Sequence, residues 1–312
     1  MCRVVWDDER GSSTMNLLQA GREEVAQQVP RDARRSASAG GPAPGAGLLT
    51  VVVVTQEDPF YIPHFFRSFC RLQSEYTDRI IVRKVVIQPS FGESKAQLAK
   101  RMLGFYGWAD FLRLLARYSR QKALLLLETL GTGHRSVSIA GICRAHGIAV
   151  HGEADVNRKA FIDQLRATGT DLIVSVSAPQ IFRQDLLKAP RHGCINIHNG
   201  RLPAYRGMLP NFWQMLNGEA QSITTIHTMV TKLDAGTVVS EEATPIRPGM
   251  SLDALIRETK ERSADALWRV LGHLAQHRSL PLLRDIDGQG RYYTFPKSHH
   301  AQQLRGRGHA LL

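Results

Sequence analysis

The sequence has few cysteines, no long apolar run and fewer acidic than basic residues. Its four cysteines are Cys2, Cys70, Cys143 and Cys194. Because their spacing fits no metal site, they indicate reduced thiols in a cytoplasmic protein. The longest unbroken apolar runs, residues 51–54 and 123–127, are far too short to span a membrane, so no membrane partner is expected.

The charge balance excludes an acidic protein. Lysine and arginine number 40 against 28 aspartates and glutamates, which gives a formal net charge of +12. Residues 1–47 contribute nothing to this excess, because six arginines there balance six acidic residues. The basic remainder suits a phosphate-bearing substrate, a polyanionic cofactor or RNA, and the charge alone does not choose among them.

Composition and pattern divide the chain into four parts. Residues 1–47 mix charges with a Ser/Ala/Gly/Pro stretch and are predicted to be a disordered extension. Residues 48–247 are predicted to form a catalytic domain. Residues 248–296 are predicted to form a helix and short extension packed on that domain, and residues 297–312 a flexible basic tail.

From residue 48 onward, strand-like and helix-like patterns alternate. The expected strands are residues 49–55, 80–88, 148–151, 171–177 and 194–198, and the expected helices between them are residues 61–72, 96–130, 136–146 and 157–168. Later segments predict a short helix at 210–216, an antiparallel strand pair at 222–230 and 237–244, and a long helix capped by Ser251. The pattern predicts an α/β fold with a doubly wound, mostly parallel sheet, in which ligands bind beyond the strands' carboxyl ends.

Three polar side chains stand out as candidate catalytic groups. Asn196 and His198 lie two positions apart on the strand that ends at residue 198, so their side chains share one face. Asp234 follows thirty-six positions after His198 in the segment Leu-Asp-Ala-Gly. An amide donor, an imidazole and a carboxylate are suited to moving an acyl group from one nitrogen to another.

The ordered set of motifs resembles the folate-dependent formyltransferase family. It consists of Asn-Ile-His at 196–198, Leu-Pro-Ala-Tyr-Arg-Gly at 202–207 and Leu-Asp-Ala-Gly at 233–236. The likeness runs from about residue 48 to residue 295. It implies a Rossmann-like fold, 10-formyltetrahydrofolate as the formyl donor and no metal. Asn196 and His198 would stabilise the developing negative oxygen, and Asp234 would raise the pKa of the imidazole.

The resemblance also implies two walls of a folate site. One wall comprises Gly200, Arg201, Leu202 and Pro203, and the other comprises Pro179, Gln180, Ile181 and Phe182. The first wall has Asn-Gly at 199–200 where the family usually has Pro-Ser, which puts one contact in doubt. Ile181 and Phe182 are equally compatible with a plain core position.

The acceptor is predicted to be a small-molecule primary amine. Pro-Asn-Phe-Trp at 210–213 and Arg-Tyr-Tyr-Thr-Phe at 291–295 look most like sugar N-formyltransferases, which act on nucleotide-linked amino sugars. This implies substrate-binding roles for Arg206, Trp213 and Tyr293, although both aromatic residues could instead pack the junction between sheet and helices. Only 78 residues follow Asp234, fewer than the added domain of the tRNA-formylating relatives requires, so a nucleic-acid acceptor is disfavoured. A homodimer is left open.

Several readings stay open beside this one. Another metabolite amine, methionyl-tRNA or a non-catalytic binding module on the same fold would each leave the motifs in place. Asn196 could be a buried strand amide, His198 a structural histidine and Asp234 a turn residue. His227 is tempting as a second catalytic group, but we expect a structural role, and we expect Cys194 to be a buried apolar residue rather than a nucleophile.

Overall fold

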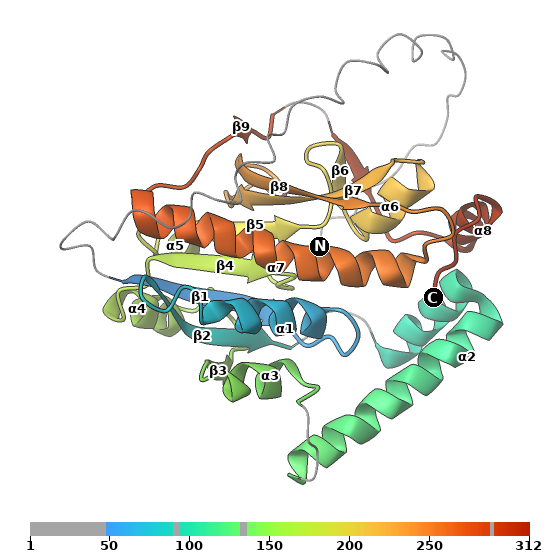
Figure 1. Ribbon diagram of the computed structural model, residues 1–312, viewed down its shortest axis with the longest axis horizontal. Helices are drawn as coiled ribbons and strands as arrows, with labels where there is room; N and C mark the ends of the chain where they lie inside the picture. The colour runs from blue at the N-terminus through green and yellow to red at the C-terminus, as the bar shows by residue number, and fades with distance from the viewer. Residues whose placement is uncertain (1–47, 90–93, 132–135, 288–289) are drawn as a thin grey trace, which may run out of the picture. The chain divides into compact units, whose positions relative to one another are not determined.

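The computed structural model describes residues 48–89, 94–131, 136–287 and 290–312, which belong to one compact unit (Figure 1). The predicted disorder of residues 1–47 lies outside the described residues. Among the described helices, none combines the length and apolar character needed to cross a membrane.

The centre of this unit is an eight-stranded sheet with the order β3-β2-β1-β4-β5-β7-β8-β9. Its parallel strands are β1 (Leu49–Gln56), β2 (Ile80–Gln88), β3 (Ala149–Gly152), β4 (Leu172–Val176) and β5 (Cys194–His198). The antiparallel strands are β7 (Gln221–Thr228), β8 (Thr237–Pro245) and β9 (Arg284–Asp285). The predicted α/β fold with a mostly parallel sheet is confirmed.

Helices cover both faces of the sheet. The helices are α1 (Ile62–Gln73), α2 (Lys95–Thr129), α3 (Ile139–Ala145), α4 (Lys159–Ala167), α5 (Gln184–Leu187), α6 (Pro210–Leu216), α7 (Leu252–His277) and α8 (Ser298–Gly306). Val51 and Val53 pack with α1, α3 and α7, whereas Val52 and Val54 pack with α4 and α5. The alternation of side chains along a strand therefore sends one valine pair into each layer.

Helix α7, drawn in orange in Figure 1, lies along α1. Its Trp268 ring stacks on Phe69 of α1 at 4.8 Å between ring centroids, and Trp268 Nε1 donates to the Phe69 carbonyl at 2.8 Å. Ser251 caps the start of α7, as the sequence predicted, by accepting a hydrogen bond from the Ala254 N–H at 3.2 Å. The long helix expected at 96–130 is broken at Gly107, where φ is 73°.

A second, two-stranded sheet pairs β6 (Tyr205–Gly207) with β10 (Arg291–Tyr293). The two strands are parallel, and Tyr293 lies opposite Gly207. The Met208 N–H also donates to the Tyr293 carbonyl at 2.8 Å. This pairing joins a segment near the end of the chain to the Leu-Pro-x-Tyr-Arg-Gly motif.

Residues 297–312, predicted to be a flexible basic tail, are folded, so that prediction is wrong. They form α8, whose Ala301 and Leu304 are fully buried against an aromatic cluster. The N–H groups of Leu252 and Asp253 at the start of α7 donate to carbonyl groups at residues 310 and 311. The tail is ordered because it buries apolar side chains and pairs helix-start N–H groups that have no partner within the helix.

Candidate active site

A cavity of about 490 Å³ lies at the carboxyl ends of the central parallel strands. Polar side chains from β1, β4, β5 and β7 or the residues after them line it: Gln56, Ser175, Ser177, Asn196, His198, Asn199 and His227. Asp234 reaches the same cavity from the loop between β7 and β8. The three predicted catalytic side chains therefore line one cavity. Its position agrees with the rule that open α/β sheets bind ligands at the carboxyl ends of their strands.

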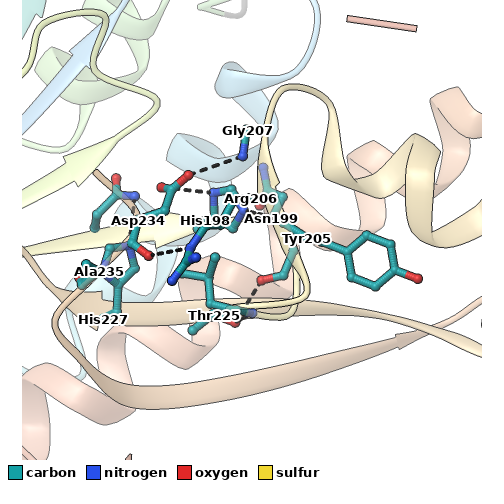
Figure 2. A network of polar contacts seen from close by, with 12 residues as sticks. His198, Asn199, Tyr205, Arg206, Gly207, Thr225, His227, Asp234 and Ala235 are labelled. Atoms are coloured by element: carbon teal, nitrogen blue, oxygen red, sulfur yellow. Dashed lines mark hydrogen bonds and ion pairs between the residues drawn. The ribbon is translucent and has the colours of Figure 1, made fainter. Parts of the chain in front are cut away.

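His198 is held at both ring nitrogens. Its Nε2 lies 2.6 Å from the Tyr205 carbonyl oxygen, which can only accept, so Nε2 carries a proton. Its Nδ1 lies 3.7 Å from Asp234 Oδ1 (Figure 2). Both side chains are about nine-tenths buried. Nδ1 is therefore the nitrogen that can take up a further proton, and the carboxylate lies where it stabilises the resulting imidazolium.

Asp234 is itself positioned by the backbone of β6. Its second carboxylate oxygen accepts a hydrogen bond from the Gly207 N–H at 3.2 Å, as Figure 2 shows. Its backbone takes a left-handed conformation, with φ of 48°, in the turn before Gly236. The Arg206 Nε donates to the Asp234 carbonyl oxygen at 3.3 Å. Arg206 is absent from the cavity lining, so it holds the loop rather than facing the predicted acceptor.

Asn196 and His227 form a cross-strand pair on β5 and β7. The His227 Nδ1 donates to the carbonyls of Thr228 and Ala235 at 2.9 and 3.0 Å, which leaves Nε2 to accept from Asn196 Nδ2 at 3.2 Å. Burial lowers the pKa of His227, which favours this neutral form. One Asn196 N–H is thus fixed, and the other is left for a ligand.

The two predicted folate walls differ in the structure. Gln180, Ile181 and Phe182 line the cavity, whereas Pro179 is absent from the lining. The lining includes no residue of the other predicted wall, which comprises Gly200, Arg201, Leu202 and Pro203. Leu202 is instead buried with Val238 and Ile286. A Cβ at Gly200 would approach the Tyr205 carbonyl oxygen at 2.8 Å, so Gly200 lets the chain close over His198 rather than forming a wall.

Trp213 and Tyr293, predicted to bind the acceptor, are not in this cavity. They belong to the buried aromatic cluster that packs against α8, which contains Phe105, Tyr106, Tyr205, Phe212, Trp213 and Tyr293. The Tyr293 ring stacks on Tyr205 at 5.5 Å between ring centroids. Trp213 Nε1 donates to the Thr294 carbonyl at 3.1 Å. The neighbouring Tyr292 lines the cavity instead, because successive residues of β10 face opposite sides.

Sequence reasoning missed Lys260, Asp58 and Tyr292, all of which line the cavity. Lys260 had a signal: it is a charged residue that interrupts the buried stripe of α7, four positions after Ile256. Cys194 is buried beside the Leu186 carbonyl, and burial raises the pKa of its thiol, in line with the expected structural role. Among the described residues, no three His, Cys, Asp or Glu side chains gather as a metal site would require.

The fold and this site define an α/β protein with an Asn-His-Asp constellation at its strand ends. The formyl transferase family model matches residues 143–271, which contain all three side chains. This region therefore belongs to the formyl transferase family, and the family predicted from the sequence is confirmed.

Two relatives match over part of the chain. Methionyl-tRNA formyltransferase of Trichlorobacter lovleyi is 36% identical over 155 residues, which cover 50% of this chain and 49% of the relative. Methionyl-tRNA formyltransferase of Geobacter sulfurreducens is 34% identical over 172 residues, which cover 51% of this chain and 54% of the relative. The matched region thus spans about half the length of these relatives.

Two solved structures share the fold. A sugar N-formyltransferase from Shewanella aligns with a TM-score of 0.50 at 15% identity, covering 84% of this chain and 88% of that structure. Phosphoribosylglycinamide formyltransferase from Anaplasma phagocytophilum aligns with a TM-score of 0.51 at 14% identity, covering 79% of this chain and all of that structure. At these identities the likeness concerns the fold alone.

Proposed function

We propose that this protein transfers a formyl group from 10-formyltetrahydrofolate to a primary amine. The observation that carries the proposal is the meeting of Asn196, His198 and Asp234 in one cavity at the strand ends. The family whose model matches uses 10-formyltetrahydrofolate as its donor, which supports the choice of donor. We propose the cytoplasm as the location.

The chain's own residues have distinct roles in this proposal. The donor supplies a formyl group whose carbonyl oxygen gains negative charge as the amine adds. The free Asn196 N–H and a protonated His198 Nδ1 stabilise that oxygen, and one such donor contributes about 10²- to 10³-fold in rate. Asp234 holds the imidazolium by its charge, and accepts, directly or through water, the proton that the amine loses.

The cavity residues fit a flat, partly apolar donor. The lining includes exposed large apolar side chains on the two loops that follow β4 and β7, namely Ile181, Val230 and Leu233. Phe182 and Met229 extend the same apolar surface inward. Exposed apolar side chains gathered at a cavity are typical of a site that encloses a ring system.

As acceptor, we propose an amine on a nucleotide-linked sugar. The likeness of residues 210–213 and 291–295 to sugar N-formyltransferases supports this class, although Trp213 and Tyr293 do not contribute to the cavity. The exposed Tyr292 ring at the cavity offers a surface on which a nucleobase could stack.

Methionyl-tRNA is the second candidate acceptor. Two observations favour it: the relatives that match at 36% and 34% identity are methionyl-tRNA formyltransferases, and the chain carries a formal net charge of +12.

A direct test mixes the purified protein with 10-formyltetrahydrofolate and one acceptor at a time. The acceptors are nucleoside-diphosphate-linked 3-amino and 4-amino sugars, glycinamide ribonucleotide and methionyl-tRNA. Release of tetrahydrofolate is followed by absorbance, and the added formyl group is identified by mass spectrometry. We expect acceptor-dependent turnover with an amino sugar, and none with the His198→Ala variant.

The same assay distinguishes the alternatives. Turnover with methionyl-tRNA alone would replace the sugar acceptor by the second candidate. Binding of 5-formyltetrahydrofolate without turnover of any acceptor would contradict catalysis and favour a binding module on this fold.

A further inference from the structure

Lys260 is a buried lysine at the active-site cavity. It lies on α7, only 4% of it is exposed, and it lines the cavity together with His198 and Asn196. Its Nζ donates to the Ser177 hydroxyl at 3.0 Å. An ammonium group carries three N–H donors, so two remain for another partner.

Within the part of the chain that the structure describes, Lys260 lacks a carboxylate at ion-pair distance. Asp58 is the acid that acts on it electrostatically, but the Asp58 carboxylate accepts the N–H groups of Phe60 and Tyr61 at the start of α1. Burial lowers the pKa of Lys260 to about 8, as expected for a desolvated amine without a close counter-charge.

Lys260 also lies on the opposite side of the sheet from the proposed folate wall. Phe182 of that wall packs with Val52, Val54 and α4 on one face. Helix α7 packs on the other face, with Val51, Val53 and α1. The cavity therefore has a Phe182 end and a Lys260 end on the two sides of the sheet, and Asn196 and His198 line the same cavity. If the donor occupies the Phe182 end, the Lys260 end is left for the acceptor.

We propose that Lys260 binds an anionic group, a phosphate or a carboxylate, of the amine acceptor and thereby selects acceptors that carry one. The inference rests on the proposed formyl transfer. The anion of the acceptor is the counter-charge for the Lys260 ammonium, and the hydrogen bond to the Ser177 hydroxyl positions that ammonium. An uncharged amine would leave the buried ammonium unpaired, so the site discriminates against it.

The first experiment measures steady-state kinetics with the amino-sugar nucleotide that gives turnover. We expect Lys260→Met to raise the acceptor KM at least tenfold while the donor KM stays within twofold, and Lys260→Arg to recover part of the loss. Lys188→Met removes the same charge from an exposed position and serves as the matched control. An unchanged acceptor KM, or a donor KM that rises as much, would overturn the proposal.

The second experiment needs no turnover, so it separates failure of this inference from failure of the proposed function. Inorganic pyrophosphate and malonate are titrated calorimetrically into the wild type, Lys260→Met and Lys188→Met. We expect at least one probe to bind the wild type and Lys188→Met, and to bind Lys260→Met at least tenfold more weakly. The stronger probe identifies phosphate or carboxylate as the preferred group. Equal binding to all three proteins, or binding of neither probe to the wild type, contradicts the inference.

Discussion

The cavity at the strand ends and the aromatic cluster under α8 contain residues that look equally functional in the sequence. In the cavity, polar side chains have ligand-facing atoms: one Asn196 N–H, the His198 Nδ1 and the Lys260 ammonium. In the cluster, the ring centroids of Trp213 and Tyr293 lie 4.7 Å apart. The Trp213 N–H and the Tyr293 hydroxyl are both hydrogen-bonded to other groups of the protein. The first region has unmet bonding capacity, and the second does not.

The difference teaches how to separate a site from a core. An unsatisfied buried donor is costly unless a ligand satisfies it, so it points to binding. A buried aromatic side chain with its N–H or O–H paired is the ordinary state of a core. Substitutions in the cavity should therefore change activity, and substitutions in the cluster should change stability.

The largest effect is expected for His198→Ala and Asp234→Ala. Each removes part of the charge that stabilises the developing oxyanion, so formyl transfer should fall by roughly 10³-fold or more. The melting temperature and the affinity for 5-formyltetrahydrofolate should stay close to wild type. His277→Ala, at an exposed position on α7, is the control. Turnover retained in either variant would discard the proposed roles.

Trp213→Ala should instead cost stability. The side chain is buried in the aromatic cluster, so the loss of free energy of unfolding should be roughly 3–5 kcal/mol, measured by urea denaturation. Both KM values should stay within twofold of wild type. Trp213→Phe should lose less and remains informative if the alanine variant does not fold. A raised acceptor KM without a loss of stability would return Trp213 to the site.

Lys260→Met should stabilise the protein. Burial lowers the pKa of Lys260 from 10.5 to about 8, so the folded state holds this proton less tightly than the unfolded state. The penalty is complete below pH 8 and disappears as the pH rises to 10.5, and its removal is worth roughly 3 kcal/mol at pH 7. Urea denaturation of both proteins at pH 7 and pH 10 measures it. A variant less stable than the wild type at pH 7 would show that Lys260 has a counter-charge after all.

The smallest effect is expected for Tyr293→Phe. Asn217 Nδ2 donates to the Tyr293 hydroxyl at 3.1 Å and to the Tyr205 hydroxyl at 3.2 Å, and removing one acceptor should cost about 1 kcal/mol in unfolding free energy. Formyl transfer should be unaffected. A changed acceptor KM with an unchanged unfolding free energy would contradict the assignment of Tyr293 to the core.

The main fold could be predicted from the sequence wherever the signal is local. The run of β-branched residues in β1 predicts a strand buried on both faces, and Ser251 marks the start of α7. Strands β6 and β10 were missed because each is three residues long and forms only by pairing with the other. Helix α8 was missed because its few apolar residues, Ala301 and Leu304, gain their burial from distant partners.

The site, like the fold, could be predicted where the sequence signal is local. Two-residue spacing on β5 places Asn196 and His198 on one face, and the loop motif brings Asp234 to them. The sequence does not say which of two neighbouring tyrosines, Tyr292 or Tyr293, faces the cavity, because that depends on how β10 pairs. The division into a domain at 48–247 and an extension at 248–296 stays a prediction, as do the roles of the individual site residues.

Gly207 contacts both β10 and Asp234, and it should be among the least permissive positions in a saturation-mutagenesis screen. Its φ of 95° is one that L side chains rarely adopt, and any Cβ there would collide with the Tyr293 carbonyl. Its N–H also orients the Asp234 carboxylate. A library at this codon would therefore lose β10 pairing and the carboxylate's orientation at the same time, so even alanine should score as a null allele.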